Sequence, residues 1–250
     1  MSVVVAYKYA FNPQDASVGA DGQIDWSRAK PAVSEYDPVA IGLARTIAGD
    51  GEVVGVSVGT AAVASSMAKK NAISKGLDRA LVVADDASAE WNATKVASAL
   101  AGLVRRVDDV EVVLAGDSSI DEGARIVPAI LAGHLGWPCF QDVLGVQKTA
   151  DGVTVIQAVT GGTRTIDITG PAVLAATSDA VEVKAASMKD ILAAGKKPLE
   201  EATADEVGVS DAAVTVTDRS RPAPQARKND IRSSADAAGL AGELRAAGIL

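Results

Sequence analysis

The sequence predicts an α/β fold: an open, mostly parallel β-sheet with helices on both faces, extended by an antiparallel hairpin insert and a C-terminal arm. Two observations lead to this prediction. In the first half of the chain, short β-branched apolar runs alternate with segments whose apolar residues recur at helical spacing, as in parallel strands joined by right-handed crossovers. After about residue 140, short apolar runs are separated by glycine turns, which is typical of an antiparallel meander.

The first half is expected to consist of alternating strands and helices. The apolar runs predict strands at residues 3–7, 53–58, 80–84 and 111–115, and helical spacing predicts helices at 38–48, 60–75, 90–106 and 124–135. Asp37 stands directly before Pro38, the arrangement of a helix N-cap followed by a first-turn proline. Residues 12–31 are polar, with a turn expected at 20–22 between short extended pieces.

The second half is predicted to be less regular. Its expected elements are antiparallel strands at residues 143–148, 153–159 and 164–168, a strand at 171–176 that could return to the main sheet, and helices at 187–194 and 235–247. From about residue 200 the chain is polar, so alone it does not offset its ordering entropy. We therefore expect an α/β domain at residues 1–199 and, at 200–250, an arm that packs on a partner subunit.

Composition and charge narrow the classes of function. A net charge of −8 argues against nucleic acid as the main partner, because phosphate binding on that scale needs a basic surface. The single cysteine, Cys139, cannot form an intrachain disulfide and fits a reducing compartment. No apolar run approaches the ~20 residues that a membrane-spanning helix needs. We expect a cytoplasmic protein without direct membrane insertion.

The most informative stretch is residues 112–123, which is predicted to run from a buried strand through a tight polar turn into a helix. Gly116 would give the backbone a conformation closed to other residues. Ser118, Ser119 and Asp121 would cap the helix that follows. Such a turn presents backbone N–H groups at a positive helix end, where a phosphate can bind.

A second strand and turn of the same design lie at residues 53–60. In an open parallel sheet, the ligand crevice lies past the carboxyl ends of the strands, where the strand order reverses. Those ends are expected at residues 6–9, 57–60 and 116–121. A single glycine turn would predict only a turn, whereas two turns with capping residues predict a nucleotide site at this edge.

The sequence lacks the usual signatures of catalysis and of metal binding. No GxGxxG follows the first strand, and no GxxxxGK(S/T) phosphate loop is present. His134 has no second histidine or cysteine at ligand spacing, and Cys139 has no histidine near it. Asp121 and Glu122 are adjacent, so on a helix they would diverge by about 100° rather than face each other. We therefore predict no catalytic residue and no metal ligand.

Five segments carry a resemblance to a known family. They are Tyr7-Lys8, Ser34-Glu35-Tyr36-Asp37, Ser57-Val58-Gly59, Gly116-Asp117-Ser118-Ser119-Ile120-Asp121 and the run SMKDILAAGKKP from Ser187 to Pro198. In their order and spacing the chain resembles, nearly from end to end, the β subunit of electron transfer flavoprotein, and most closely its Fix-type branch (FixA-like). The resemblance implies an adenine nucleotide alpha hydrolase-like domain without hydrolase activity.

The same resemblance implies a cofactor, partners and site residues. The pocket would hold AMP or FAD. The chain would pair with an FAD-carrying α subunit (FixB-like), on which its arm would pack, and the complex would pass electrons from an acyl-CoA-type or other flavin dehydrogenase, or from NADH, to a quinone or ferredoxin. Together with Gly116, the implied pocket residues are Ala6, Tyr9, Asp37, Ser57, Gly59, Ser119, Asp121, Glu122, Gly123, Ala124, Arg125, Ile126 and Val127. The residues implied in docking on the dehydrogenase are Met188, Ile191 and Leu192.

The sequence departs from the family pattern at a point that matters for phosphate. Arg125, Ile126 and Val127 stand where the housekeeping branch has Asn-Gln-Thr, so amide and hydroxyl donors are lost. Arg125 could replace them as a phosphate clamp, or it could be an exposed arginine on its helix. AMP, FAD and an empty pocket all stay open. Met188 could be an apolar docking residue or a core contact of its short helix.

Two other classes of function are alternatives to an electron carrier. A stress-protein-like ATP-binding regulatory module has a similar fold, but it would lack the hairpin insert and the long arm that this sequence predicts. A nucleotide-hydrolase-type enzyme is disfavoured because the phosphate-loop signature is missing.

Overall fold

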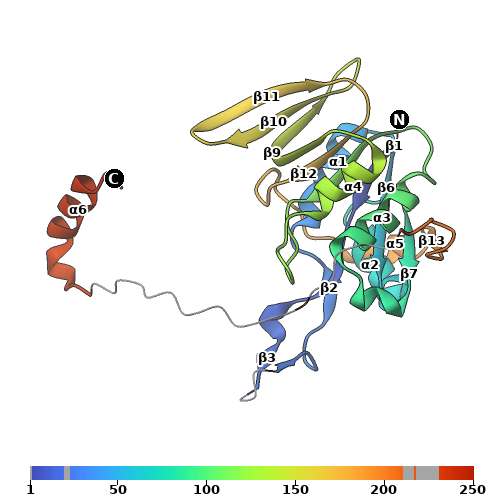
Figure 1. Ribbon diagram of the computed structural model, residues 1–250, viewed down its shortest axis with the longest axis horizontal. Helices are drawn as coiled ribbons and strands as arrows, with labels where there is room; N and C mark the ends of the chain where they lie inside the picture. The colour runs from blue at the N-terminus through green and yellow to red at the C-terminus, as the bar shows by residue number, and fades with distance from the viewer. Residues whose placement is uncertain (1, 20–22, 211–216, 218–230) are drawn as a thin grey trace. The chain divides into compact units, whose positions relative to one another are not determined.

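The computed structural model describes residues 2–19, 23–210, 217 and 231–250. Within these residues, the main sheet has nine strands in the order β11-β10-β9-β12-β8-β1-β6-β7-β13 (Figure 1). They are β1 (Ser2–Ala6), β6 (Glu52–Gly59), β7 (Arg79–Ala84), β8 (Val110–Gly116), β9 (Cys139–Lys148), β10 (Val153–Val159), β11 (Gly162–Ile168), β12 (Ala172–Ala176) and β13 (Leu199–Ala202). Neighbouring strands from β12 to β13 pair in parallel, and β9, β10 and β11 form an antiparallel meander. The predicted α/β class with a mostly parallel sheet is confirmed.

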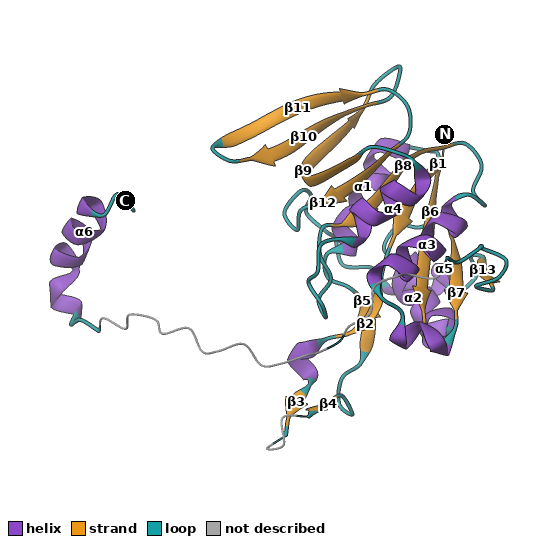
Figure 2. Ribbon diagram, in the orientation of Figure 1, coloured by secondary structure: helices purple, strands orange, loops and turns teal. Residues whose placement is uncertain are grey.

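Helices cover both faces of this sheet (Figure 2). They are α1 (Asp37–Ala48), α2 (Ser66–Ile73), α3 (Ala93–Val104), α4 (Val127–Leu135) and α5 (Met188–Ala194). On one face, side chains of α1 and α2 share a core with Val3 and Val5. On the other face, side chains of α3 and α4 share a core with Val4 and Ala6. Alternate residues of one strand thus enter two separate cores, which explains why the strand reads as a continuous apolar run.

The segment between β1 and α1 forms two small antiparallel pairs. The strands are β2 (Tyr9–Phe11) with β5 (Pro31–Val33), and β3 (Ser17–Val18) with β4 (Ile24–Asp25), and η1 (Pro13–Asp15) is a short 3-10 helix after β2. The short extended pieces predicted for this polar segment are therefore present. The turn predicted at 20–22 lies outside the described residues.

Three helices of the first half are interrupted or shortened relative to the prediction, and two of them owe this to a single residue. The helix expected at 60–75 is split into η2 (Ala61–Ala64) and α2, because Ser65 is extended, with ψ 152°, and its side chain caps α2. Helix α4 begins at Val127 rather than at residue 124. The cause is Arg125, whose φ of 56° cannot continue an α-helix.

Helix α3 also starts later than predicted. The helix expected at 90–106 begins at Ala93, after η3 (Asp86–Glu90). Asn92 caps it through its side chain, and a capping residue that is not itself helical sets the start of the helix.

The strand β12 lies in the main sheet, as predicted, and the sheet contains one further strand, β13, that was not predicted. β12 returns to the main sheet beside β8, with Val173 in register with Val113. β13 was not predicted, because its sequence LEEA has only one large apolar residue. It pairs with β7, with Leu199 in register with Ala80, and so occupies the edge of the sheet.

The chain divides into two compact units, Met1–Thr215 and Val216–Leu250. The boundary expected at 199/200 falls inside the first unit, because β13 belongs to the sheet and the Ser210 N–H donates to Ser98 Oγ of α3 at 3.0 Å. These contacts extend the α/β unit beyond the boundary predicted at residue 199.

The second unit contains the C-terminal helix that the sequence predicts. The 3-10 helix η4 (Ser234–Asp236) leads into α6 (Ala237–Ala246). Arg232 donates two hydrogen bonds, of 2.9 and 2.7 Å, to the Glu243 carboxylate. Residues 211–216 and 218–230 of the expected arm lie outside the described residues. In the described parts of the chain, no helix is both long enough and apolar enough to cross a membrane.

Candidate functional site

The crevice predicted past the carboxyl ends of the strands has a definite place in the topology. From β1 the chain proceeds outward to β6 and β7, then places β8 and β12 on the other side of β1. The strand order therefore reverses between β1 and β8, where Ala6 is in register with Ala115 and Gly116 ends the strand. In open α/β sheets, ligands bind at such a switch point.

The carboxylate of Asp37 lies at this switch point. Asp37 is only 4% exposed, and it accepts hydrogen bonds from the backbone N–H groups of Lys8, at 2.7 Å, and of Gly116. Burial raises the pKa of Asp37 to about 7, although both N–H groups favour the charged form. The prediction that Asp37 is the N-cap of α1 is wrong. The cap position is Tyr36, and the Asp37 side chain turns to β1 and β8 instead.

Gly116 is required for close approach rather than for its backbone angle. Its φ is not positive, so the predicted reason for this glycine is wrong. A Cβ at this position would lie 2.6 Å from Tyr36 Cβ and 2.8 Å from Asp37 Oδ1. Any side chain here would push the start of α1 away from the end of β8.

Lys8 holds the loop after β8 against the end of β1. Its Nζ lies 2.7 Å from Asp121 Oδ2 and 3.9 Å from Glu122 Oε2. Burial raises the pKa of Asp121, but the hydrogen bond and charge of Lys8 outweigh it and hold that pKa below its ordinary value. Ser34 anchors the same loop, because its Oγ accepts the Ile120 N–H at 3.2 Å.

Residues 117–126 form a loop rather than the tight turn that the sequence predicts. Helix α4 begins after this loop, and its N-cap residue, Ile126, makes no side-chain hydrogen bond to the helix. The residues predicted as caps do not cap it: Ser118, Ser119 and Asp121. The predicted pocket residues within the loop are Ser119, Asp121, Glu122, Gly123, Ala124, Arg125 and Ile126, and Val127 is the first residue of α4.

Backbone N–H groups of this loop are bonded within the protein. The Gly123 N–H donates to Ser119 O at 3.0 Å and also lies 3.4 Å from Ser119 Oγ. The Glu122 N–H donates to Asp121 Oδ1 at 2.9 Å. Together with the Ile120 N–H, these groups would have to leave their partners to bind a phosphate.

Arg125 joins the loop to β9. Its Nη2 lies 2.9 Å from Asp117 Oδ2 and 2.5 Å from Asp142 Oδ1, and its carbonyl accepts Gln141 Nε2 at 2.9 Å. Arg125 is exposed, as one of its two interpretations had it, but it lies in the loop before α4 and not on a helix. The other oxygen of Asp117, Oδ1, is buried and has no hydrogen-bond partner among the described residues. Burial raises the pKa of Asp117.

The remaining predicted pocket residues lie on neighbouring elements. Ser57 is buried in β6, and its hydroxyl donates to Tyr7 O at 2.7 Å. Gly59 ends the same strand, in register with Ala84 of β7, and thus lies one strand beyond β1. Tyr9 is half-buried in β2, and burial raises its pKa. The structure therefore gathers Ala6, Asp37, Gly116 and Asp121 at the switch point and places Gly59 farther along the same edge.

Four residues of the switch point were not among the predicted pocket residues: Lys8, Ser34, Asp117 and Asp142. Lys8 and Asp117 each follow a strand closely, and this position was a usable signal. Asp142 gave none, because it reaches Arg125 only through an irregularity in the register of β9 against both of its neighbours. Such an irregularity depends on strand pairing that one sequence does not reveal.

The comparison with protein families gives one match. The family model described as the electron transfer flavoprotein domain matches residues 22–207. The chain belongs to this family. The matched residues include α1, the whole of the loop after β8 and the helix α5.

In this electron transfer flavoprotein domain, α5 presents apolar side chains to the solvent. Met188 is 71% exposed and Leu192 is 65% exposed, whereas Ala194 is buried. Met188 is therefore not a core contact of its helix. Ile191, the third predicted docking residue, is partly exposed. A capping box at Ser187 sets the start of the helix.

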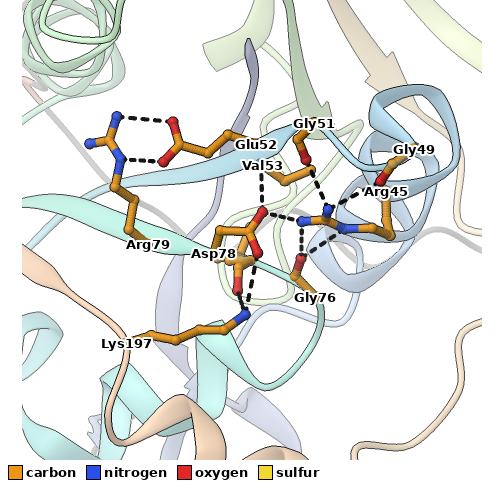
Figure 3. A network of polar contacts seen from close by, with 10 residues as sticks. Arg45, Gly49, Gly51, Glu52, Val53, Gly76, Asp78, Arg79 and Lys197 are labelled. Atoms are coloured by element: carbon orange, nitrogen blue, oxygen red, sulfur yellow. Dashed lines mark hydrogen bonds and ion pairs between the residues drawn. The ribbon is translucent and has the colours of Figure 1, made fainter. Parts of the chain in front are cut away.

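The segment that follows α5 is bound at the amino ends of the strands, whereas the switch point lies at their carboxyl ends. Lys197 Nζ donates to Leu77 O at 2.6 Å and lies 3.4 Å from Asp78 Oδ1 (Figure 3). Asp78 precedes β7 directly, at the amino end of that strand. The exposed helix of the electron transfer flavoprotein domain is thus held by a buried alanine and by an ion pair after its last turn.

Among the described residues, no group of three or more histidine, cysteine, aspartate or glutamate side chains could hold a metal ion. Near the switch point, Lys8 pairs with Asp121 and Glu122, and Arg125 pairs with Asp117 and Asp142, whereas Asp37 accepts backbone N–H groups. The electrostatics of this edge are therefore those of ion pairs between single cations and carboxylates.

Proposed function

We propose that this chain is the β subunit of an electron transfer flavoprotein of the Fix type. It binds an adenine nucleotide, AMP or FAD, at the switch point and forms a heterodimer with an FAD-carrying α subunit (FixB-like). The observation that carries this proposal is the family match over residues 22–207, which takes in nearly the whole α/β domain. The protein would act as an electron carrier subunit rather than as a stand-alone catalyst.

The residues at the switch point fit a phosphate group through their cations. Lys8 reaches the loop after β8 from the end of β1, and Arg125 belongs to that loop; each is bound to carboxylates that a phosphate could replace. Asp37 and Gly116 bring α1 and β8 into contact, so they would shape the floor of the pocket. If the nucleotide is FAD, its isoalloxazine ring supplies the redox chemistry, and these residues bind and orient it.

The partners follow from the same proposal. The exposed Met188 and Leu192, with Ile191, would dock on an acyl-CoA-type or other flavin dehydrogenase, because exposed methionine and leucine adapt to an apolar partner surface. The polar C-terminal residues would pack on the α subunit. Electrons would pass from the dehydrogenase, or from NADH, to a quinone or ferredoxin. We further propose a cytoplasmic location.

A stress-protein-like ATP-binding module is the second candidate, because its fold would be similar. The meander of β9, β10 and β11 weighs against it, since such a module would lack this insert. The family match also favours the electron carrier.

The decisive experiment co-expresses the chain with its α subunit and identifies the nucleotide that leaves the denatured complex. A stable heterodimer that releases FAD, or FAD and AMP, supports the proposal. If the chain forms no complex with the α subunit and instead retains ATP when purified alone, the stress-protein-like function replaces it. The flavin absorption spectrum of the intact complex measures the FAD content independently.

A further inference from the structure

The ion pair between Arg125 and Asp142 has an unusual backbone at both ends. Arg125 has φ 56° and Asp142 has φ 55°. Non-glycine residues rarely adopt positive φ, and arginine has no side-chain contact to its own backbone that would favour it. Arg125 therefore occupies a conformation that costs free energy, and its partner Asp142 shares it, although aspartate tolerates positive φ better than most side chains.

The ion pair itself does not explain this conformation. The side chains of Arg125 and Asp142 are 49% and 47% exposed, and exposed ion pairs stabilise proteins little because water screens them. The backbone at Asp142 belongs to a register irregularity that β9 shows against β10 and against β12. Backbone strain that the local contacts do not offset is found preferentially at binding and switch sites.

The two carboxylates that hold Arg125 differ in how firmly they are placed. Asp117 is 12% exposed, and its backbone N–H is bonded to Ala176 O at 2.9 Å. Asp142 is half-exposed. A ligand oxygen that approaches from the solvent would therefore displace Asp142 before Asp117.

We propose that Asp142 competes with the phosphate of the bound nucleotide for Arg125 and thereby sets the affinity of the site. This inference rests on the proposed nucleotide site and adds to it a residue, Asp142, that acts through its ion pair with the arginine. Without ligand, Asp142 holds Arg125 and the loop 117–126 against β9. When a phosphate binds, the guanidinium keeps Asp117 and exchanges its single contact with Asp142 for phosphate oxygens, which a guanidinium can bind through two nitrogens.

The test compares the affinity of the full chain for AMP, FAD and adenosine by titration calorimetry. Asp142→Asn is expected to bind AMP and FAD about fivefold more tightly, the size of a strong exposed ion pair. Its affinity for adenosine should equal that of the unmodified chain, because adenosine has no phosphate. Arg125→Gln should weaken AMP and FAD binding, and adding Asp142→Asn to it should change nothing further.

A control variant tests whether the gain in affinity comes from competition for Arg125 or merely from the loss of a nearby negative charge. Asp179 is exposed, and its charge raises the pKa of Asp117, so it lies close to the same cluster, whereas the ion pairs of Arg125 are with Asp117 and Asp142. Asp179→Asn should leave AMP affinity within about twofold of the unmodified chain. An equal gain in Asp179→Asn, or a gain for Asp142→Asn that persists without Arg125, overturns the inference.

A second measurement does not depend on a ligand. Amide hydrogen exchange of residues 118–126 should become faster in Asp142→Asn and stay unchanged in Asp179→Asn, because only the first releases Arg125. Unchanged exchange and unchanged AMP affinity in Asp142→Asn overturn the inference and leave the nucleotide site standing. If no folded variant binds AMP or FAD, the proposed nucleotide site fails as well.

Discussion

Charged clusters lie at both ends of the parallel strands, and they are built differently. We call the side formed by the amino ends of the strands the amino edge and the side formed by their carboxyl ends the carboxyl edge. At the amino edge, Asp78 accepts hydrogen bonds from Arg45, at 2.5 Å, and from the Val53 N–H, at 2.9 Å, and it also pairs with Lys197. Arg45 further donates to Gly76 O at 2.9 Å (Figure 3). Burial raises the pKa of Asp78, but these donors outweigh it and hold that pKa below its ordinary value. Each charge of this amino-edge network therefore has several partners.

At the carboxyl edge, the same kinds of side chain are less well satisfied. Asp117 has a buried oxygen that finds no partner in the described part of the chain, burial raises the pKa of Asp37 to about 7, and the Arg125–Asp142 pair has positive φ at both ends. The comparison shows that the sheet concentrates its stabilising contacts at the amino edge and its strain at the edge where we propose nucleotide binding. Functional sites commonly carry such strain and perturbed pKa values.

The largest expected effect is the pH dependence caused by Asp37. Between about pH 4 and 7 the unfolded carboxyl is ionised while the folded one keeps its proton, so the folded state binds more protons and stability falls as the pH rises. The free energy of unfolding should fall by about 4 kcal/mol across this range. Urea unfolding at a series of pH values measures it.

Two substitutions assign this slope to its source. Asp37→Asn should remove it. Asp121→Asn should leave it in place, because Lys8 keeps Asp121 ionised throughout this range. If the free energy of unfolding of Asp37→Asn still falls with pH, another group causes the slope. Asp37 would then not distinguish the carboxyl edge from the amino edge.

The next largest effect is expected at the contact between β8 and α1. Gly116→Ala should lower the free energy of unfolding by about 3 kcal/mol, because its Cβ would overlap Tyr36 and Asp37. Gly59→Ala is the matched control on β6. Its Cβ would lie 3.4 Å from Val63 Cβ, so the change should stay within about 0.5 kcal/mol. Equal losses in both variants would show that Gly116 is not specially constrained.

The same substitution in one carboxylate of each edge, Asp78 and Asp117, tests the comparison directly. Asp78→Asn should destabilise the protein by about 2 kcal/mol, because it weakens hydrogen bonds from Arg45 and Lys197 to a charged acceptor. Asp117→Asn should change stability by no more than about 0.5 kcal/mol, since one of its oxygens is buried and has no partner among the residues that the structure describes. Thermal and urea unfolding measure both. A larger loss at Asp117 would reverse the roles of the two edges.

The smallest effect on stability is expected at Met188. Because its side chain is 71% exposed, Met188→Ala should leave the free energy of unfolding within about 0.5 kcal/mol of the unmodified chain. If Met188 docks on a dehydrogenase, affinity for that partner should fall about thirtyfold, as for a hot-spot residue. Val18→Ala, at a site of equal exposure on β3, serves as control. Normal dehydrogenase-coupled flavin reduction in Met188→Ala would refute the docking role.

The sequence predicted the elements that depend on local pattern. The valine runs of β1, β6 and β8 and the helical spacing of α1 and α3 place the sheet and its switch point close to where they lie. Single residues were harder to interpret. Gly116 was correctly singled out, but its reason is a contact with α1 that no local pattern contains.

The loop after β8 shows why the candidate site was predicted only in part. The spacing of apolar residues predicted a helix from residue 124. Because Arg125 has positive φ, the helix begins only at Val127. This conformation accompanies the contact with Asp142, which depends on a register irregularity in β9. β13 was missed for a related reason, because an edge strand of mostly polar residues is defined by its pairing with β7 rather than by its composition.

The late position of β13 in the chain has a consequence for synthesis on the ribosome. Leu77 O and Lys197 Nζ, which join across the end of β7, are 120 residues apart in sequence. Until β13 emerges, β7 is an open sheet edge that other nascent chains could pair with. Contacts of such long sequence separation also form late in folding. We therefore expect the helix α5 to take its place only after nearly the whole α/β unit has been translated.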